Sequence, residues 1–369
     1  MSKLIILSRV KRHLKLGNSI FGVPAKWDKT EGNITSISEK KEKLVKAFTD
    51  LNFLFVIARI WTIARKEKAS LSESIVGNTL TSLAVINFLL RHNPPDYVQM
   101  QFLNYLFSSE DIDPRKQWAT VLTVLGFFFD VIEVGYYVIG TSLAILTMLF
   151  PCQPGLLSSI LCSPEGVLIN VPFFKFLRLA IFPALECLIF IQVAVGSAYH
   201  ILTVLLTSVT FLWIEIETFI KRYKTGTFDQ KLYRKVQIFE KLLNSCTRER
   251  IFLKVALLMP AFQVMMLYVT IRMSHAHQDF LTVAFLYLYL ASSGFTVLTF
   301  STAGKVYGAS QDWITKSKTG ERKKYERKFH YSLIPLRLQF GSNFVEPLTP
   351  LVVQEFCIRQ TISFLLLTK

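Results

Sequence analysis

Long apolar stretches alternate with shorter polar segments along most of the chain. A helix needs about 20 residues to cross the hydrocarbon core of a bilayer, so stretches of this length predict membrane-spanning helices. We therefore expect an all-α membrane protein, a bundle of seven transmembrane helices. The spans are predicted within residues 44–63, 75–90, 121–150, 177–214, 252–271, 280–300 and 350–367.

The fourth apolar stretch is about twice as long as a bilayer requires. It could hold two spans, but Gly196-Ser197 is the only turn signal inside it, and a weak one. We expect one long helix that leaves the membrane and continues to Lys224. The chain then divides into a cytoplasmic N-terminal segment, helices one to four, a basic loop, helices five and six, a second basic segment and the last helix. These parts cover residues 1–43, 44–220, 221–250, 251–300, 301–349 and 350–369.

The composition supports a membrane protein. Of the 369 residues, 51% are hydrophobic, 31 are Phe and only 18% are charged, with a mean hydropathy of +0.38. About a quarter of the residues of an ordinary soluble domain are charged, so a soluble enzyme is not expected, and a disordered or collagen-like chain is excluded. The sequence has no P-loop, Gly-x-Ser-x-Gly or His-Glu-x-x-His motif. We expect neither enzymatic activity nor a cofactor.

The net charge of +16 describes topology rather than a nucleic-acid partner, because no nucleic-acid-binding motif accompanies it. Lys and Arg gather before the first span and at residues 221–254 and 305–337. Cytoplasmic loops are rich in these residues, so we expect a cytoplasmic N-terminus and, after seven spans, an extracellular C-terminus. The location predicted is the plasma membrane, as a multi-pass protein. The sequon at Asn33 would then stay in the cytosol, unmodified.

The expected chain has seven spans, an inside N-terminus and basic segments before the fifth and seventh spans, and it ends in the last helix. This arrangement resembles that of the arthropod chemoreceptor superfamily, which contains the odorant and gustatory receptors, along the whole chain. The final segment, Phe356-Cys-Ile-Arg-Gln-Thr-Ile-Ser-Phe-Leu-Leu-Leu-Thr-Lys369, is similar in position and polarity to the last helix of these receptors. Gustatory receptors usually have Thr-Tyr, five apolar residues and Gln-Phe there. This chain has Thr361-Ile362 and no Gln-Phe, which leaves the subfamily open.

The resemblance implies a chemosensory receptor subunit that acts as a ligand-gated, non-selective cation channel, opened by a small organic molecule. It implies a homo- or hetero-tetramer, with co-receptor subunits as partners in the second case, embedded in the lipid bilayer. The last helix of each subunit would line a central pore, and intracellular parts of the last three helices would form an anchor. The ligand would bind in an apolar pocket in the outer half of each bundle.

Aromatic and Met side chains in the outer halves of the helices are candidates for this pocket. Each of them alone is equally compatible with a lipid-facing or core position, so the prediction concerns the region. The candidates are Tyr136, Tyr137, Phe190, Met265, Met266, Tyr268, Phe285 and Tyr287.

The last helix carries a stripe at three-four spacing that suits a pore closed by a hydrophobic gate, or else ordinary helix packing. Glu355 and Arg359 are four residues apart and are expected to pair, either within one subunit or at a pore vestibule or subunit contact. The stripe consists of Gln354, Cys357, Ile358, Thr361, Leu365 and Thr368.

Other polar residues in or near the spans have two interpretations each. Asp130 and Glu133 share a helix face, at the inner membrane boundary or in ion handling. Glu186 has no close partner, and Arg178 is a candidate.

Cys152 and Cys162 fall in one predicted outer loop, where a disulfide is chemically permitted. His275 and His277 are too isolated to form a metal site, so none is expected.

Two other functions are compatible with seven spans. A receptor that signals through a cytoplasmic partner, of the G-protein-coupled type, would have an outside N-terminus and glycosylation at Asn33. A small-solute transporter would show inverted repeats and broken helices in two halves. The sequence shows no such repeats.

Overall fold

The computed structural model describes residues 2–66, 70–93, 97–108, 116–162, 180–225, 231–316 and 324–368. Almost all of these residues are helical, and the short strands form only two hairpins. Among them are seven helices long and apolar enough to cross a membrane. The expected class, an all-α seven-helix membrane protein, is confirmed.

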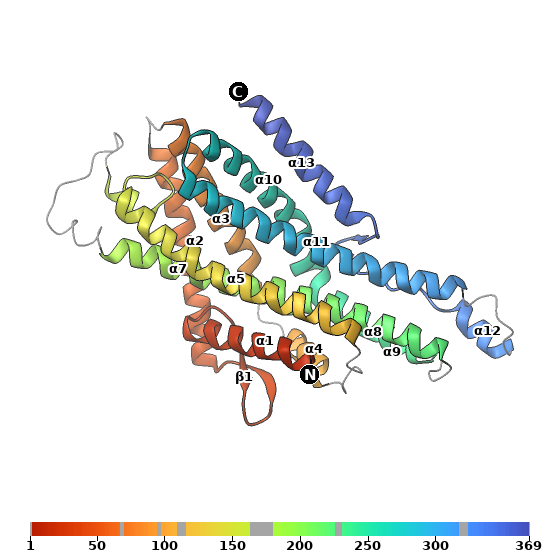
Figure 1. Ribbon diagram of the computed structural model, residues 1–369. Helices are drawn as coiled ribbons and strands as arrows, with labels where there is room; N and C mark the ends of the chain where they lie inside the picture. Colours follow the sequence, from red (N-terminus) through yellow and green to blue (C-terminus); the bar gives the residue numbers. More distant parts are fainter. Residues whose placement is uncertain are drawn as a thin grey trace.

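The seven candidate spans follow the hydropathy pattern, with longer helices than the apolar stretches alone. Several are longer than a bilayer requires, and their extensions pack together at one end of the molecule, on the right of Figure 1. The spanning elements are α2 (Glu39–Arg65), α3 (Leu71–Arg91), α5 (Lys116–Leu149), α7 (Phe182–Ala198) continuing through η3 (Tyr199–Leu206) into α8 (Thr207–Lys224), α9 (Lys231–Thr247) continuing through η4 (Arg248–Phe252) into α10 (Leu253–His275), α11 (Asp279–Lys316) and α13 (Thr349–Leu367).

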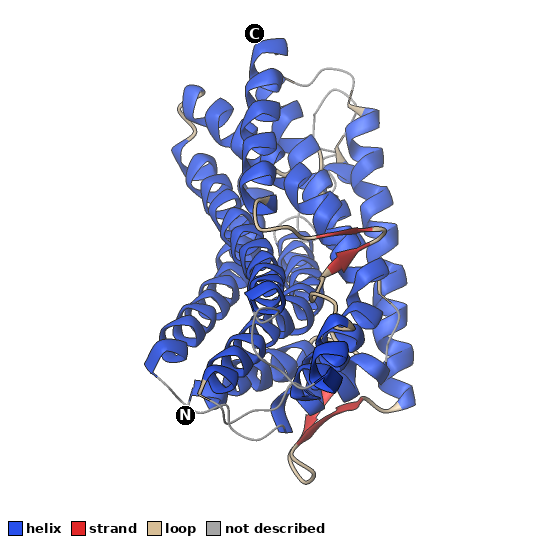
Figure 2. Ribbon diagram, turned by 90° about the vertical axis from the view of Figure 1, so that its right-hand side faces the viewer, coloured by secondary structure: helices blue, strands red, loops and turns tan. Residues whose placement is uncertain are grey.

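The remaining elements are short. A 3-10 turn lies after α5, and a second strand pair precedes the last helix. Both strand pairs are red in Figure 2. These short elements are α1 (Ser2–Ser19), β1 (Ala25–Asp28), β2 (Asn33–Ser36), α4 (Tyr97–Ser108), η1 (Leu157–Leu161), α12 (Lys324–Tyr331), β3 (Gln339–Phe340) and β4 (Asn343–Phe344).

The fourth span is one long helix, as the absence of a strong turn signal predicted. From Phe182 to Lys224 it covers 43 residues, and its central segment η3 is a π-helix. Thr207 Oγ1 donates to the carbonyl of Leu202, five residues earlier, 2.9 Å away. Nearly every side chain of η3 is buried, so this segment runs through the middle of the bundle.

The segment before the first span is structured and docks onto the bundle. Strand β1 pairs antiparallel with β2, and α1 packs against α5 and α7. Arg9 Nη2 lies 3.0 Å from Asp130 Oδ2, and Arg12 Nε lies 2.7 Å from Glu133 Oε2; Arg12 also pairs with Asp130. The two α5 carboxylates are therefore partners of α1, which accounts for both without ion handling.

Two apolar clusters form the core. The larger one follows η3 and α8 between α1, α5, α9 and α11. The smaller one lies between α3, α5, α10 and α11, towards the opposite end of the spans. Helix α13 packs against α10 and α11 only along one side and stands at the edge of the bundle in Figure 1. Its other side is exposed in the single chain.

Candidate ligand cavity and the last helix

A cavity of about 120 Å³ lies within the bundle, where α3, α5, α7, η3, α10 and α11 meet. We call it the central cavity. Most of its wall is aliphatic or aromatic, which suits an apolar ligand. Its side chains include Leu83, Asn87, Phe128, Ile132, Tyr136, Phe190, Ser197, Met259, Phe262, Tyr287, Ala291 and Phe295.

The polar groups on this wall are largely paired with protein. Ser197 Oγ donates to Asn87 Oδ1 at 3.1 Å, and Asn87 Nδ2 donates to the carbonyl of Leu83 at 2.9 Å. Tyr287 Oη donates to the carbonyl of Val131 at 2.6 Å. The Tyr136 hydroxyl is buried and has no hydrogen-bond partner within the described part of the chain. Because most polar groups are already satisfied, the wall favours molecules with a large apolar surface and few polar atoms.

Three of the eight predicted ligand residues line the central cavity: Tyr136, Phe190 and Tyr287. Met266 and Phe285 are buried in the smaller apolar cluster. Neither these two residues nor the remaining three line the central cavity. Tyr137 is 46% exposed on the outside of α5, and Met265 and Tyr268 line a groove between α10 and α13.

Several wall residues were missed by the sequence analysis. Phe128, Met259 and Phe295 look like any apolar span residue, and only the packing of helices distant in sequence brings them together. Asn87 did carry a signal, because an amide in an apolar stretch needs a partner or a function. Its partner is Ser197, 110 positions away.

The last helix turns part of its predicted pore stripe towards its own chain. Cys357 and Thr361 are each 2% exposed, and Cys357 Sγ lies 3.7 Å from the carbonyl of Pro260 on α10. Gln354 Nε2 donates to Thr296 Oγ1 on α11 at 3.2 Å. In the single chain these three residues make helix-packing contacts, the alternative to a place along a pore.

The rest of the stripe is split between the two sides of α13. Leu365 is half-buried, and Thr368 Oγ1 accepts from Tyr268 Oη at 3.2 Å. Ile358 belongs to the exposed side, together with Glu355 and Arg359, which form the expected ion pair at 2.5 Å. That side consists of Leu351, Glu355, Ile358, Arg359, Ile362 and Leu366.

A buried polar chain connects the cavity wall with α13. Gln263 Nε2 on α10 donates to Thr296 Oγ1 at 2.6 Å and to the carbonyl of Ser292, a wall residue, at 3.2 Å. Thr296 Oγ1 is in turn the acceptor for Gln354. One hydroxyl therefore joins three helices. Because the surroundings are apolar, breaking this junction leaves amide groups without partners.

At the end of the bundle where α5 finishes, a buried ion pair holds the following loop. Arg59 on α2 pairs with Glu186 on α7, and Arg59 Nη1 donates to the carbonyl of Gly155 at 2.6 Å. Glu186 Oε1 accepts from the backbone N–H of Leu157 at 2.7 Å. Glu186 thus has a partner that the sequence did not reveal; the candidate Arg178 lies outside the described residues.

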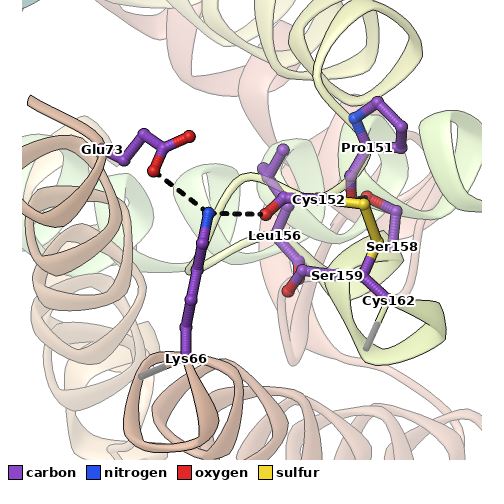
Figure 3. The surroundings of a disulfide bond; sticks show 8 residues. All are labelled: Lys66, Glu73, Pro151, Cys152, Leu156, Ser158, Ser159 and Cys162. Carbon is purple, nitrogen blue, oxygen red and sulfur yellow. Dashed lines mark hydrogen bonds and ion pairs between the residues drawn. A yellow bond between two sulfur atoms is a disulfide. The ribbon is translucent and has the colours of Figure 1, made fainter. Parts of the chain in front are cut away.

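The same loop contains the disulfide between Cys152 and Cys162. Figure 3 shows Lys66 beside it, with Nζ 3.4 Å from the carbonyl of Cys152 and 3.1 Å from Glu73 Oε2. The ends of α2, α3 and α5 therefore meet at this loop. No group of three or more potential metal-binding side chains occurs among the described residues, which include His275 and His277.

The long fourth helix and the single-sided last helix define a seven-helix membrane-protein fold with a cavity inside the bundle. No protein-family model and no curated protein matches the sequence. Solved structures share this fold, among them two of an insect olfactory receptor. The insect olfactory receptor OR5 from Machilis hrabei matches 99% of both chains, with a TM-score of 0.64 and 13% identity. The same receptor in complex with eugenol matches 100% of both chains, with a TM-score of 0.62 and 12% identity. At this identity the likeness is one of fold.

Proposed function

We propose that this protein is a chemosensory receptor subunit, for taste or odour, which works as a ligand-gated, non-selective cation channel. The observation that carries the proposal is the central cavity, a mostly apolar space of about 120 Å³ lined by helices of the bundle. A second observation supports it: the fold is shared over the whole chain with a receptor whose structure contains eugenol. A small, mostly apolar organic molecule fits this space chemically.

The proposal includes an assembly. The exposed side of α13 consists mainly of aliphatic side chains around the Glu355–Arg359 pair. A charged pair on a spanning helix is costly in lipid, so this side is expected to face protein or water. Four copies arranged around their last helices, alone or with co-receptor subunits, would place the pair at a pore or a subunit contact.

The orientation proposed is a cytoplasmic N-terminus and an extracellular C-terminus in the plasma membrane. The end of α10 contacts the end of α13 through the bond between Tyr268 and Thr368. The start of α11, which follows the end of α10 in the chain, lines an open pocket together with the loop after α5. The disulfide in that loop therefore lies at the same end of the bundle as the ends of α10 and α13. Disulfides persist in oxidising compartments, which supports placing this end outside. Tags at Met1 and after Lys369, probed with antibody on intact and permeabilised cells, test it.

The function is tested by whole-cell recording from cells that express the chain, alone and with candidate co-receptors, while eugenol and other small odorants are applied. We expect a cation current, which Ala291→Leu suppresses because the larger side chain fills the central cavity. Ala119→Leu, on an exposed position of α5, is the control and should not change the current. A response that requires GTP and no channel current would favour signalling through a cytoplasmic partner instead.

A further inference from the structure

A second, smaller cavity lies beside the central one, between α2, α3, α5 and α7. We call it the side chamber. Its volume is about 40 Å³, whereas one water molecule needs about 10–15 Å³ by the same measure. Leu83, Asn87 and Phe190 line both spaces, so their side chains form the partition between them. Phe190 is half-buried, so a change of its side-chain rotamer would alter the shape of this partition.

Asn52 on α2 lies on the wall of the side chamber and is 2% exposed. Its Nδ2 donates to Gln192 Oε1 at 3.2 Å. Its Oδ1 is buried and has no hydrogen-bond partner within the residues the structure describes. An unpaired carbonyl oxygen in an apolar interior is costly, so such a group in a folded protein requires an explanation.

The orientation of the Asn52 amide follows from its neighbours. The oxygen and nitrogen of an amide are told apart by the bonds they make. Gln192 Nε2 is 2.9 Å from the carbonyl of Ile20 and 3.5 Å from that of Phe21, both of which can only accept. Gln192 therefore presents its oxygen to Asn52, and Asn52 must present its nitrogen in return. Oδ1 is left as the free atom, and it can only accept a hydrogen bond.

We propose that the side chamber is a ligand subsite for a hydroxyl group, which donates its proton to Asn52 Oδ1. The inference rests on the proposed ligand-binding role of the central cavity and names the ligand class: an alcohol or phenol whose apolar body occupies that cavity. The hydroxyl end passes the partition at Phe190. The remaining chamber wall includes the apolar Val56, Leu80 and Ala84. Arg59 also lines the chamber, but its guanidinium is already paired with Glu186, so a charged ligand end would lose its hydration without gaining a free partner.

The test uses two isomers, 1-octanol and 1-methoxyheptane, which have the same atoms but differ in the ability to donate. Binding to the purified full-length chain in lipid nanodiscs is measured without recording current. We expect 1-octanol to bind about tenfold more tightly, the effect of one buried hydrogen bond. Asn52→Leu should abolish this preference. Asn78→Leu, the same exchange on the exposed side of α3, should retain it.

Asn52→Leu also removes the bond to Gln192, so a second variant keeps Asn52 and closes the space. Ala84→Leu fills the side chamber and should likewise make the two isomers equal. Equal binding of the isomers to the unchanged protein, or density for an ordered water on Oδ1 that persists with the alcohol bound, would overturn the proposal. Preferential binding of 1-octanol without any current would preserve the subsite and contradict the channel function, so the two failures are distinguishable.

Discussion

The ring of Tyr287 on α11 lies against the backbone of Gly135 on α5 at the wall of the central cavity. Tyr287 Oη reaches the carbonyl of Val131, 2.6 Å away. A Cβ atom built on Gly135 would lie 2.9 Å from Cε1 of the tyrosine, closer than real Cβ atoms approach. A residue larger than glycine at position 135 would require the Tyr287 ring to shift, so this pair contributes to the close approach of the two helices beside the cavity.

Replacing Gly135 by alanine should displace Tyr287 and distort the cavity wall. We expect a loss of about 1–3 kcal/mol in the free energy of unfolding, the usual result of overpacking, and weaker ligand binding. Thermal unfolding and ligand titration of the purified protein measure both. Gly308→Ala is the control, since its Cβ would lie 3.8 Å from Pro347 Cγ, an ordinary contact. Similar behaviour of the two variants would show that Tyr287 has room to move.

The junction at Thr296 should couple α10 to α13. Gln263→Leu and Gln354→Leu each remove one amide from the shared hydroxyl. In a double-mutant cycle on the ligand concentration for half-maximal current, we expect a coupling energy of about 0.5–1.5 kcal/mol. Gln360→Leu, further along α13 on the groove, should add independently to either change. If the effects of Gln263→Leu and Gln354→Leu on this concentration are strictly additive, the cavity wall and the last helix are not energetically coupled through Thr296.

Breaking the buried pair Arg59–Glu186 on one side should cost more than removing both charges. Glu186→Gln leaves the guanidinium without its carboxylate, and the expected loss is about 3–5 kcal/mol of unfolding free energy. Arg59→Met with Glu186→Leu should be closer to the unchanged protein. Denaturant unfolding in detergent compares the variants. Lys43→Met, in an exposed pair with Glu39, serves as the control, with a loss of about 0.5 kcal/mol or less.

His13 on α1 should make stability depend on pH. Its Nε2 lies 3.1 Å from the carbonyl of Val195. Burial, reinforced by the nearby charge of Arg12, lowers its pKa from 6.5 to about 4, against the opposing effect of the Val195 bond. Above pH 6.5 the imidazole is neutral in both the folded and the unfolded chain, and its contribution to stability is complete.

As the pH falls from 6.5 towards 4, the unfolded chain binds the proton first, and stability decreases by up to about 3 kcal/mol. Unfolding midpoints of the purified protein between pH 7.5 and 4.5 measure this loss. The difference between the unchanged protein and His13→Gln isolates it from other titrating groups. Parallel pH curves would mean that the folded chain accepts the proton on His13 without cost.

The fold could be predicted because its main determinant is one-dimensional. Each span needs a sufficient length of apolar residues, and the unbroken fourth stretch indicated one helix where a turn would have indicated two. The pairing of Glu355 with Arg359 was equally predictable, since residues four apart on a helix are neighbours. These relationships depend on positions close together in the sequence.

The sites depend on contacts between distant positions. The spacing of Cys357 and Thr361 identified one helical face, but it could not show whether that face meets α10 or water. Arg59 and Glu186 are separated by 127 positions, and α1 was counted as a polar segment although Arg12 docks it onto α5. Only the arrangement of whole helices determines which of many apolar side chains surround a cavity.

The π-helical segment η3 has a geometric effect on the whole fourth span. A wide turn accommodates an additional residue, and each residue of an α-helix advances by about 100° around the axis. Helix α7, which packs against α3 and α5, is therefore out of phase with α8, which packs against α9 and α11. Deleting one residue between Tyr199 and Leu206 would restore a regular α-helix, but it would rotate one part of the fourth span relative to the other. The same helix could then no longer present the correct faces both to the cavity wall and to α9 and α11.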